Sequence, residues 1–280
     1  MTITSDKLSA LRAAVAASPE YADIVPFFSA LYEYISGREH ETGITVKLDG
    51  INVHQRISNK FPLISVHDLE IDRKQSAKFI AGVIQVLSAA GREGQEELAW
   101  VYAALDSGVL DPGPLFAAIL ERRRAILDEA ATAADVPPAL LEYLLEIPLR
   151  TALELAASTV AAGSFDGWEE GHCPFCGSRA GMAELVGDEG RRRLSCATCS
   201  TSWPFKRLKC AYCATENDDD LSYFTAGDGP TRVDTCKACS RYIKTRDARL
   251  GGGDIPLEVQ DLLTIHLDLL ALREGFERGK

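Results

Sequence analysis

Eight cysteines are the residues of this sequence best suited to chemistry, and they form four Cys-x-x-Cys pairs. The pairs are Cys173 with Cys176, Cys196 with Cys199, Cys210 with Cys213, and Cys236 with Cys239. In such a turn two thiolates converge on one metal ion while backbone N–H groups point at the sulfurs. No cysteine occurs in the first 172 residues, whereas cysteines used only as small core residues would be scattered more evenly. The clustering therefore predicts metal binding.

The intervals between the pairs indicate how they combine. Nineteen residues separate Cys176 from Cys196 and twenty-two separate Cys213 from Cys236, each enough for a β-hairpin, but only ten separate Cys199 from Cys210. Sequential pairing is therefore the economical arrangement. It gives two metal ions per chain, site one on Cys173, Cys176, Cys196 and Cys199, and site two on Cys210, Cys213, Cys236 and Cys239.

Four thiolates close each predicted site, whereas a catalytic zinc keeps one position open for water or substrate. The pattern therefore favours a structural or electron-transfer role over hydrolysis. Sulfur-only tetrahedral ligation suits zinc or rubredoxin-type iron, and the spacing does not separate them. Four disulfides are disfavoured by the paired spacing and the expected reducing setting, and a thioredoxin-like pair would need one Cys-x-x-Cys beside a βαβ pattern.

Several other side chains in the cysteine-rich region have two possible roles. His172 precedes the first pair, and we expect it to lie beside the site because four cysteines already fill the ligand positions. A basic strip is formed by Arg191 to Arg193, Lys206, Arg207 and Lys209. It can balance the charge of thiolate-bound metal, or it can contact nucleic acid or an acidic protein. Trp203, Phe205 and Tyr212 are expected to fill a small core rather than stack on bases.

The composition is that of a globular protein, with 280 residues, 46% hydrophobic residues and 25% charged residues. No apolar run approaches the roughly 20 residues needed to span a bilayer, so we expect no membrane insertion. The first ten residues lack the basic and apolar pattern of a secretory signal, which favours a cytoplasmic location. The net charge of -11 makes nucleic acid an unlikely partner and favours proteins.

The first 165 residues read mainly as helices, because apolar positions recur at intervals of three and four. One helix is expected over residues 18–37, opened by the Ser-Pro pair at its start and kinked at Pro26. A longer amphipathic helix is expected over residues 112–134. Two prolines at 137 and 138 open a further helix, which Pro148 should interrupt. Residues 38–65 show no clean period and suggest a long loop with possible short strands.

The sequence predicts an α+β protein in three parts. An N-terminal all-helical domain covers residues 1–167. A module of two tandem rubredoxin-like or zinc-ribbon units with four cysteines each covers residues 168–250. The run Gly251-Gly252-Gly253 reads as a flexible joint, and the C-terminal helix of residues 251–280 is expected to pack back on the body because its apolar face is too broad for an isolated helix.

Motifs that would indicate a reaction are missing from the sequence. We find no phosphate-binding Gly-x-x-x-x-Gly-Lys loop, no Gly-x-Ser-x-Gly elbow, no His-Glu-x-x-His and no Rossmann glycine pattern after a strand. The remaining histidines, His40, His54, His67 and His266, are dispersed and have no evident nucleophile partner. We therefore expect no catalytic residue and no enzymatic activity.

The order of helical part, four cysteine pairs and terminal helix resembles the FdhE family of formate dehydrogenase accessory proteins over nearly the whole chain. The most specific stretches are Cys173-Pro-Phe-Cys176-Gly177-Ser178, Leu194-Ser195-Cys196-Ala197-Thr198-Cys199 followed by Trp203, Lys209-Cys210-Ala211-Tyr212-Cys213, Cys236-Lys237-Ala238-Cys239 and Asp261 through Leu272. All eight cysteine positions of the family pattern are filled. The terminal segment contains Asp261, His266 and Asp268, to which the pattern assigns no role.

The resemblance implies a cytoplasmic, chaperone-like factor that assists maturation of respiratory, molybdenum-containing formate dehydrogenase and contacts its catalytic subunit. It implies two rubredoxin-like ribbons that hold iron or zinc, and no dehydrogenase activity. Two alternatives stay open from the residues alone. One is an iron protein for electron transfer or redox sensing, and the other is a zinc-ribbon nucleic-acid binder that uses Arg191 to Arg193.

Overall fold

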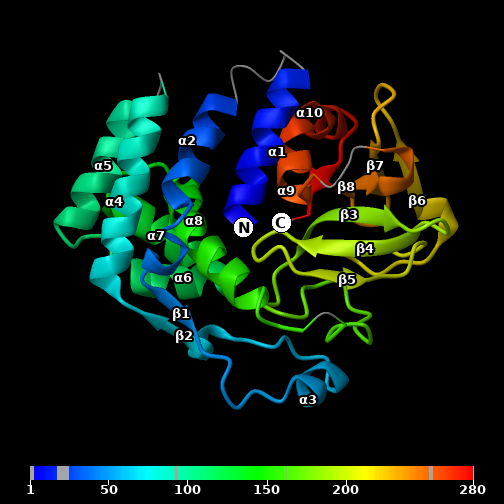
Figure 1. Cartoon of the computed structure of the whole chain (residues 1–280), viewed down its shortest axis with the longest axis horizontal. Coiled ribbons are helices and arrows are strands. Elements are labelled where there is room, and N and C mark those ends of the chain that lie inside the picture. Colours follow the sequence, from blue (N-terminus) through cyan, green and yellow to red (C-terminus); the bar gives the residue numbers. More distant parts are fainter. Residues whose placement is uncertain (1–2, 18–24, 92–93, 162, 252–254, 280) are drawn as a thin grey trace. The chain divides into compact units, whose positions relative to one another are not determined.

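The computed structural model describes residues 3–17, 25–91, 94–161, 163–251 and 255–279 of the chain (Figure 1). The chain divides into two compact units. The first unit comprises Met1–Asp49 and Ile64–Ser158, and the second comprises Gly50–Leu63 and Thr159–Lys280. Among the described residues, no helix has the length and apolar character needed to cross a membrane. The three-part domain division expected from the sequence stays a prediction.

The first unit is built mainly from helices. They are α1 (Ile3–Ala17), α2 (Val25–Ile35), α4 (Arg73–Ala90), α5 (Gln95–Asp106), α6 (Pro112–Leu120), α7 (Arg124–Ala133) and α8 (Pro138–Ala157). Helix α8 is the central element, because α4, α6 and α7 all pack on it. Its residues Leu141, Leu144 and Leu153 are buried. Helix α1 is connected to α8 by a buried ion pair between Lys7 and Glu154, at 2.7 Å.

This unit is not purely helical, because β1 (Ile44–Val46) and β2 (Leu69–Ile71) pair as a two-stranded antiparallel sheet. The first strand lies in the stretch where the sequence suggested short strands. The second was not foreseen, since three residues are too few to show an alternating pattern. Short 3-10 turns at Glu39–Glu41 and Val66–Asp68 flank the pair. Asp68 closes the second turn by accepting hydrogen bonds from the backbone and hydroxyl of Ser65.

Two of the expected helices differ from the structure, one at a proline and one at an arginine. The described part of α2 begins at Val25, and the expected helix start at residues 18 and 19 lies outside the described residues, so the kink expected at Pro26 stays a prediction. Pro148 does not end α8, whose flanking Leu145 and Leu149 are buried in the core. The expected helix over residues 112–134 divides into α6 and α7, where Arg122 has a positive φ of 57°.

The second unit contains helix α3 (Val53–Ser58) and the cysteine-rich sheet. Its strands are β3 (Ala180–Val186), β4 (Arg191–Cys196), β5 (Ser202–Pro204), β6 (Leu221–Phe224), β7 (Thr231–Cys236), β8 (Arg241–Asp247) and β9 (Glu277–Arg278). A 3-10 turn at Asp218–Asp220 precedes β6, and another at Ala248–Leu250 follows β8. Helices α9 (Leu257–Leu263) and α10 (Ile265–Arg273) complete the unit.

The cysteine-rich strands form one sheet in the order β5-β4-β3-β8-β7-β6, with β9 added beside β8. Strands β3, β4 and β5 are an antiparallel trio, and β6, β7 and β8 repeat it. The two trios meet where β3 pairs in parallel with β8, with Met182 opposite Lys244 and Leu185 opposite Asp247. The two ribbons are therefore halves of a continuous sheet that share backbone hydrogen bonds.

The two C-terminal helices cover one face of this sheet beside β7 and β8 (Figure 1). Val233 and Tyr242 of the sheet form a buried cluster with Leu267 and Ala271 of α10. A single terminal helix was expected, but the helix is interrupted at Thr264, which separates α9 from α10. The predicted glycine joint falls largely on residues 252 and 253, which are outside the described residues.

A buried ammonium group explains the break between α9 and α10. The Lys244 side chain of β8 has no exposed surface, and its Nζ donates to the carbonyl oxygens of Asp261 at 2.7 Å and Thr264 at 3.2 Å. The same Nζ lies 2.6 Å from Asp268 Oδ2 and 2.8 Å from Asp261 Oδ1. A cation that binds the last carbonyls of α9 takes the place of continued helical hydrogen bonds. Arg278 also pairs with Asp261, at 2.6 Å.

Replacing Lys244 by Met is predicted to lower the free energy of unfolding by about 3 kcal/mol, because two carboxylates then lose a buried counter-charge. Lys206→Met is the matched control, since Lys206 and Glu216 form an exposed pair. The control should cost under about 1 kcal/mol. Urea unfolding followed by circular dichroism measures both. Equal effects of the two substitutions would show that the Lys244 network does not hold the C-terminal helices on the sheet.

Candidate metal centres

Four similar backbone turns hold the cysteine pairs. In each, the residue after the second cysteine has a positive φ: Gly177 at 76°, Ser200 at 56°, Ala214 at 60° and Ser240 at 54°. Only the first is a glycine, so three residues with side chains adopt a conformation that costs energy. Four repetitions of one strained turn indicate that something at the sulfurs stabilises it. Metal coordination supplies such a stabilisation.

Backbone hydrogen bonds close each turn and point N–H groups at the sulfurs. Cys173 N donates to Ser178 O at 2.7 Å, and Cys196 N donates to Thr201 O at 2.9 Å. The amide of Phe175 donates to Cys173 Sγ at 3.4 Å. Equivalent bonds run from Thr198 N to Cys196 Sγ at 3.3 Å and from Tyr212 N to Cys210 Sγ at 3.4 Å. Such donors stabilise thiolates.

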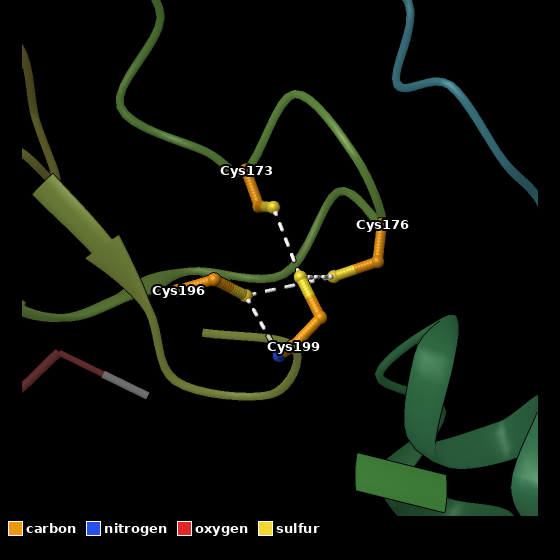
Figure 2. A group of neighbouring side chains, drawn as sticks. All are labelled: Cys173, Cys176, Cys196 and Cys199. Carbon is orange, nitrogen blue, oxygen red and sulfur yellow. Dashed lines mark hydrogen bonds between the residues drawn. The ribbon is translucent and has the colours of Figure 1, made fainter. Parts of the chain in front are cut away.

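The fold brings the eight cysteines together in two groups, the same groups that the spacing predicts. Within each group the four Sγ atoms all lie within 4.8 Å of one another. Figure 2 shows the sulfurs of Cys173, Cys176, Cys196 and Cys199 turned toward one another. The second group consists of Cys210, Cys213, Cys236 and Cys239. All eight are free thiols, so the structure contains none of the disulfides weighed as an alternative.

The sulfur separations fit a tetrahedral metal. A Zn–S bond of about 2.3 Å gives an S···S edge of about 3.8 Å in a regular tetrahedron. In the second group, Cys210 and Cys239 are 3.8 Å apart and Cys213 and Cys236 are 3.7 Å apart. In the first group, the Cys173–Cys199 and Cys176–Cys196 separations are both 3.5 Å. Rubredoxin-type iron has the same sulfur tetrahedron, so the geometry accepts either ion.

The electrostatics of the two groups also favour binding of a cation. Burial raises the pKa of the Cys173 and Cys199 thiols well above the usual value. It likewise raises the pKa of Cys236 to about 11. At Cys176 burial also opposes ionisation, but hydrogen bonds from the other three cysteines outweigh it and lower the pKa well below the usual value. Four adjacent thiolates are stable only when a positive ion compensates their repulsion and desolvation.

The two groups differ in exposure. All four cysteines of the first group are buried. In the second group Cys213 is exposed and Cys239 is half-buried, whereas Cys210 and Cys236 are buried. This difference was not visible in the sequence, because both groups have the same Cys-x-x-Cys pattern. Solvent or a reagent can therefore reach the second group directly, but not the first.

The neighbours named from the sequence have mostly structural positions. Trp203 is fully buried, and Phe205 is nearly so, which confirms their expected place in the core. Tyr212 donates from its hydroxyl to Ala180 O at 3.1 Å, and burial raises its pKa. His172 is in neither cysteine group; its ring lies edge-on against Trp168 with 5.0 Å between the ring centroids.

The basic strip does not form one exposed surface. Arg192 is buried, with 5% of its side chain exposed, and its Nη1 donates to Lys209 O at 2.9 Å. Arg193 turns to Ser202, where its Nε donates to the hydroxyl at 3.0 Å. Alternate residues of a strand point to opposite faces, so neighbouring arginines of β4 cannot contact one strand of nucleic acid together. This weakens the nucleic-acid interpretation.

Asp261 and Asp268 were noted in the sequence without a role, and the structure gives them one as carboxylate partners of Lys244 and Arg278. Asp234 of β7 was missed altogether. It accepts from Arg232 Nε at 2.7 Å and from Thr245 Oγ1 at 2.7 Å. A single aspartate in an alternating strand gives no signal in the sequence, since a solvated residue would have the same pattern.

Together, the helices, the sheet and the two groups define a mixed helix-and-sheet protein with two four-cysteine sites for metal ions. No family model matches the chain. An FdhE homologue from Aquifex aeolicus is 27% identical over 263 residues, which cover 92% of this chain and 87% of that protein. An FdhE homologue from Stutzerimonas stutzeri is 32% identical over 109 residues, which cover 38% of this chain and 35% of that protein.

The fold agrees with these sequence matches. The crystal structure of the FdhE protein from Pseudomonas aeruginosa has a TM-score of 0.71 to this chain at 19% identity, and the match covers 99% of this chain and 93% of that one. The chain therefore resembles FdhE proteins in sequence and in fold over nearly its whole length. These relatives carry no enzyme name.

Exposure predicts that metal-loaded protein releases its two ions at different rates. A chelator added in excess should remove one ion per chain in a fast phase from the second group and one in a slow phase from the first, since a reagent reaches Cys213 but no ligand of the first group. A colorimetric chelator in stopped flow measures both phases.

Two variants assign these phases. Cys213→Ala is expected to abolish the fast phase and leave the slow one, and Cys176→Ala is expected to do the reverse. If Cys176→Ala instead removes the fast phase, the buried group is the labile one and exposure does not control release.

Proposed function

We propose that this chain is an accessory protein that assists assembly of respiratory formate dehydrogenase by binding its catalytic subunit. Its metal ligands are Cys173, Cys176, Cys196, Cys199, Cys210, Cys213, Cys236 and Cys239. The proposal rests chiefly on the two complete four-sulfur groups, because such sites leave no open position for a substrate. The similarity to an FdhE homologue over 92% of the chain also supports it, because the resemblance to that family implies this role. On this view the protein is no enzyme and acts in the cytoplasm.

We also propose an architecture in three parts. Residues 1–167 would form a helical domain, residues 168–250 two tandem rubredoxin-like ribbons that hold iron or zinc, and residues 251–280 a C-terminal helical segment that packs back on the body. Two bound metal ions would stabilise the ribbons, which have only a small hydrophobic core of their own.

Limited proteolysis of metal-free protein is expected to cut the ribbons first. Simultaneous loss of residues 1–167 would contradict the proposed boundary.

Binding of the catalytic subunit is testable by co-purification. Affinity-tagged, metal-loaded chain should recover the catalytic subunit of formate dehydrogenase when the two are produced together. A tagged, unrelated protein of similar size and net charge is the control, because a charge of -11 could by itself attract cationic surfaces. Recovery of the subunit by both proteins, or by neither, would contradict specific binding.

A second candidate function, electron transfer or redox sensing at an iron site, is favoured by the exposed Cys213 of the second group. An iron that cycles between oxidation states needs a short path to its reaction partner, and an exposed ligand provides one. Protein purified without oxygen should then contain iron and show thiolate-to-iron charge-transfer absorption that is lost on reduction. Colourless protein containing zinc alone would exclude this candidate.

A further inference from the structure

A pocket of about 220 Å³ lies within the second unit beside the second cysteine group. Strands β6, β7 and β8 form one side of it, and the segment from Arg207 to Tyr212 forms another. Residues opposite one another in the sheet share a face, so Tyr223, Asp234 and Ile243 lie on one face in register. Tyr242 and Val233 lie on the opposite face, against α10. The pocket is therefore on the sheet face that the C-terminal helices leave uncovered.

The pocket is rich in positive charge. Its cationic lining residues are Arg192, Arg207, Lys209, Arg232 and Arg241, and its carboxylate is that of Asp234. Cys210 and Cys236 also line it, and four thiolates on a divalent metal carry two negative charges. Five cations exceed these three negative charges. The excess is local, since the whole chain has a net charge of -11.

Arg192 is the most constrained of these cations. Its side chain is 5% exposed, and burial lowers its pKa. Nη1 donates to Lys209 O at 2.9 Å, and Nη2 lies 3.8 Å from Asp234 Oδ2. Its Nε is buried and has no hydrogen-bond partner among the described residues. A buried guanidinium with an unused donor is costly, and an oxyanion in the pocket would satisfy it.

Asp234 cannot fully neutralise Arg192. Its Oδ1 accepts from Arg232 Nε at 2.7 Å, and its Oδ2 accepts from Thr245 Oγ1 at 2.7 Å. The ion pair with Arg192 is long by comparison, at 3.8 Å. One carboxylate thus serves two arginines and a hydroxyl. The remaining positive charge is available to a ligand.

The rim of the pocket is apolar. Tyr223 is 62% exposed, and the Arg232 guanidinium lies 4.3 Å from its ring centroid, which fixes the ring as a platform. Leu208 is 57% exposed on the other side. An exposed aromatic ring beside a buried cation favours a ligand that has both a flat apolar group and a negative charge.

We propose that this pocket binds a small organic anion, in which a phosphate or carboxylate group meets Arg192 and a flat apolar group lies against Tyr223. The volume of about 220 Å³ suits one charged group and one ring. It is below the roughly 300 Å³ at which typical drug-sized ligand pockets begin, so a larger ligand would extend over the rim. This proposal goes beyond the proposed role in formate dehydrogenase assembly and does not rest on it.

Calorimetric titration of the metal-loaded full chain with three probes tests the proposal. Phenyl phosphate has both groups, inorganic phosphate lacks the ring, and benzyl alcohol lacks the charge. Phenyl phosphate should bind most tightly, inorganic phosphate more weakly, and benzyl alcohol not measurably. Added salt should weaken the binding of both anions. Absence of anion binding at low salt, or equal binding of benzyl alcohol, would overturn the proposal.

Variants at two neighbouring arginines test whether the anion binds at Arg192. Arg192→Gln should weaken binding of phenyl phosphate by about tenfold or more, the effect of losing a hydrogen bond from a charged group. Arg191→Gln is the matched control, because Arg191 is exposed and lies next along β4 on the other face. Equal weakening by both substitutions would show only a general charge effect and would overturn the assignment.

An exposed position keeps the test decisive if Arg192→Gln does not fold. Tyr223→Ala removes the platform at a residue that is 62% exposed, so the sheet should tolerate it. Affinity for phenyl phosphate should fall to that of inorganic phosphate, while affinity for inorganic phosphate should not change. Unchanged binding of phenyl phosphate in this variant would place the ligand elsewhere and overturn the proposal.

Discussion

The compensation of thiolate charge by a metal ion is the constraint on which the rest of the second unit depends. Four sulfurs within 4.8 Å cannot all be ionised without a cation between them. The turns that carry them place Ser200, Ala214 and Ser240 at positive φ, which adds conformational strain. Metal binding offsets both costs, so the same interaction supports the backbone geometry and the sheet built on it.

One continuous sheet connects the two cysteine groups. Each group connects three strands, and the parallel pairing of β3 with β8 links the trios by backbone hydrogen bonds. Lys244 lies on β8 at this junction, opposite Met182, and it also binds the carbonyl end of α9. Strand β8 therefore links one ribbon both to the other ribbon and to the C-terminal helices. The structure is thus less modular than two independent ribbons in series.

The sequence predicted the two cysteine groups because a Cys-x-x-Cys turn is a local motif whose geometry follows from four residues. It also predicted mainly helices in the first part, where apolar periodicity reports the buried face. The sequence could not predict features that depend on contacts between residues far apart in the chain. The break at Thr264 depends on Lys244, twenty residues earlier, and α8 continues through Pro148 because its flanking leucines are buried. The exposure of Cys213 likewise depends on packing, which identical motifs do not encode.

Closed metal sites limit how the protein can act on other molecules. A four-sulfur site has no position for a substrate, so any influence must pass through the ligand sulfurs or the surface around them. In the first group all sulfurs are buried, which suits support of the fold. In the second, Cys213 is exposed and the cationic pocket adjoins Cys210 and Cys236. A molecule bound there would touch the sheet at the metal ligands, so communication with the metal centres is expected at the second group.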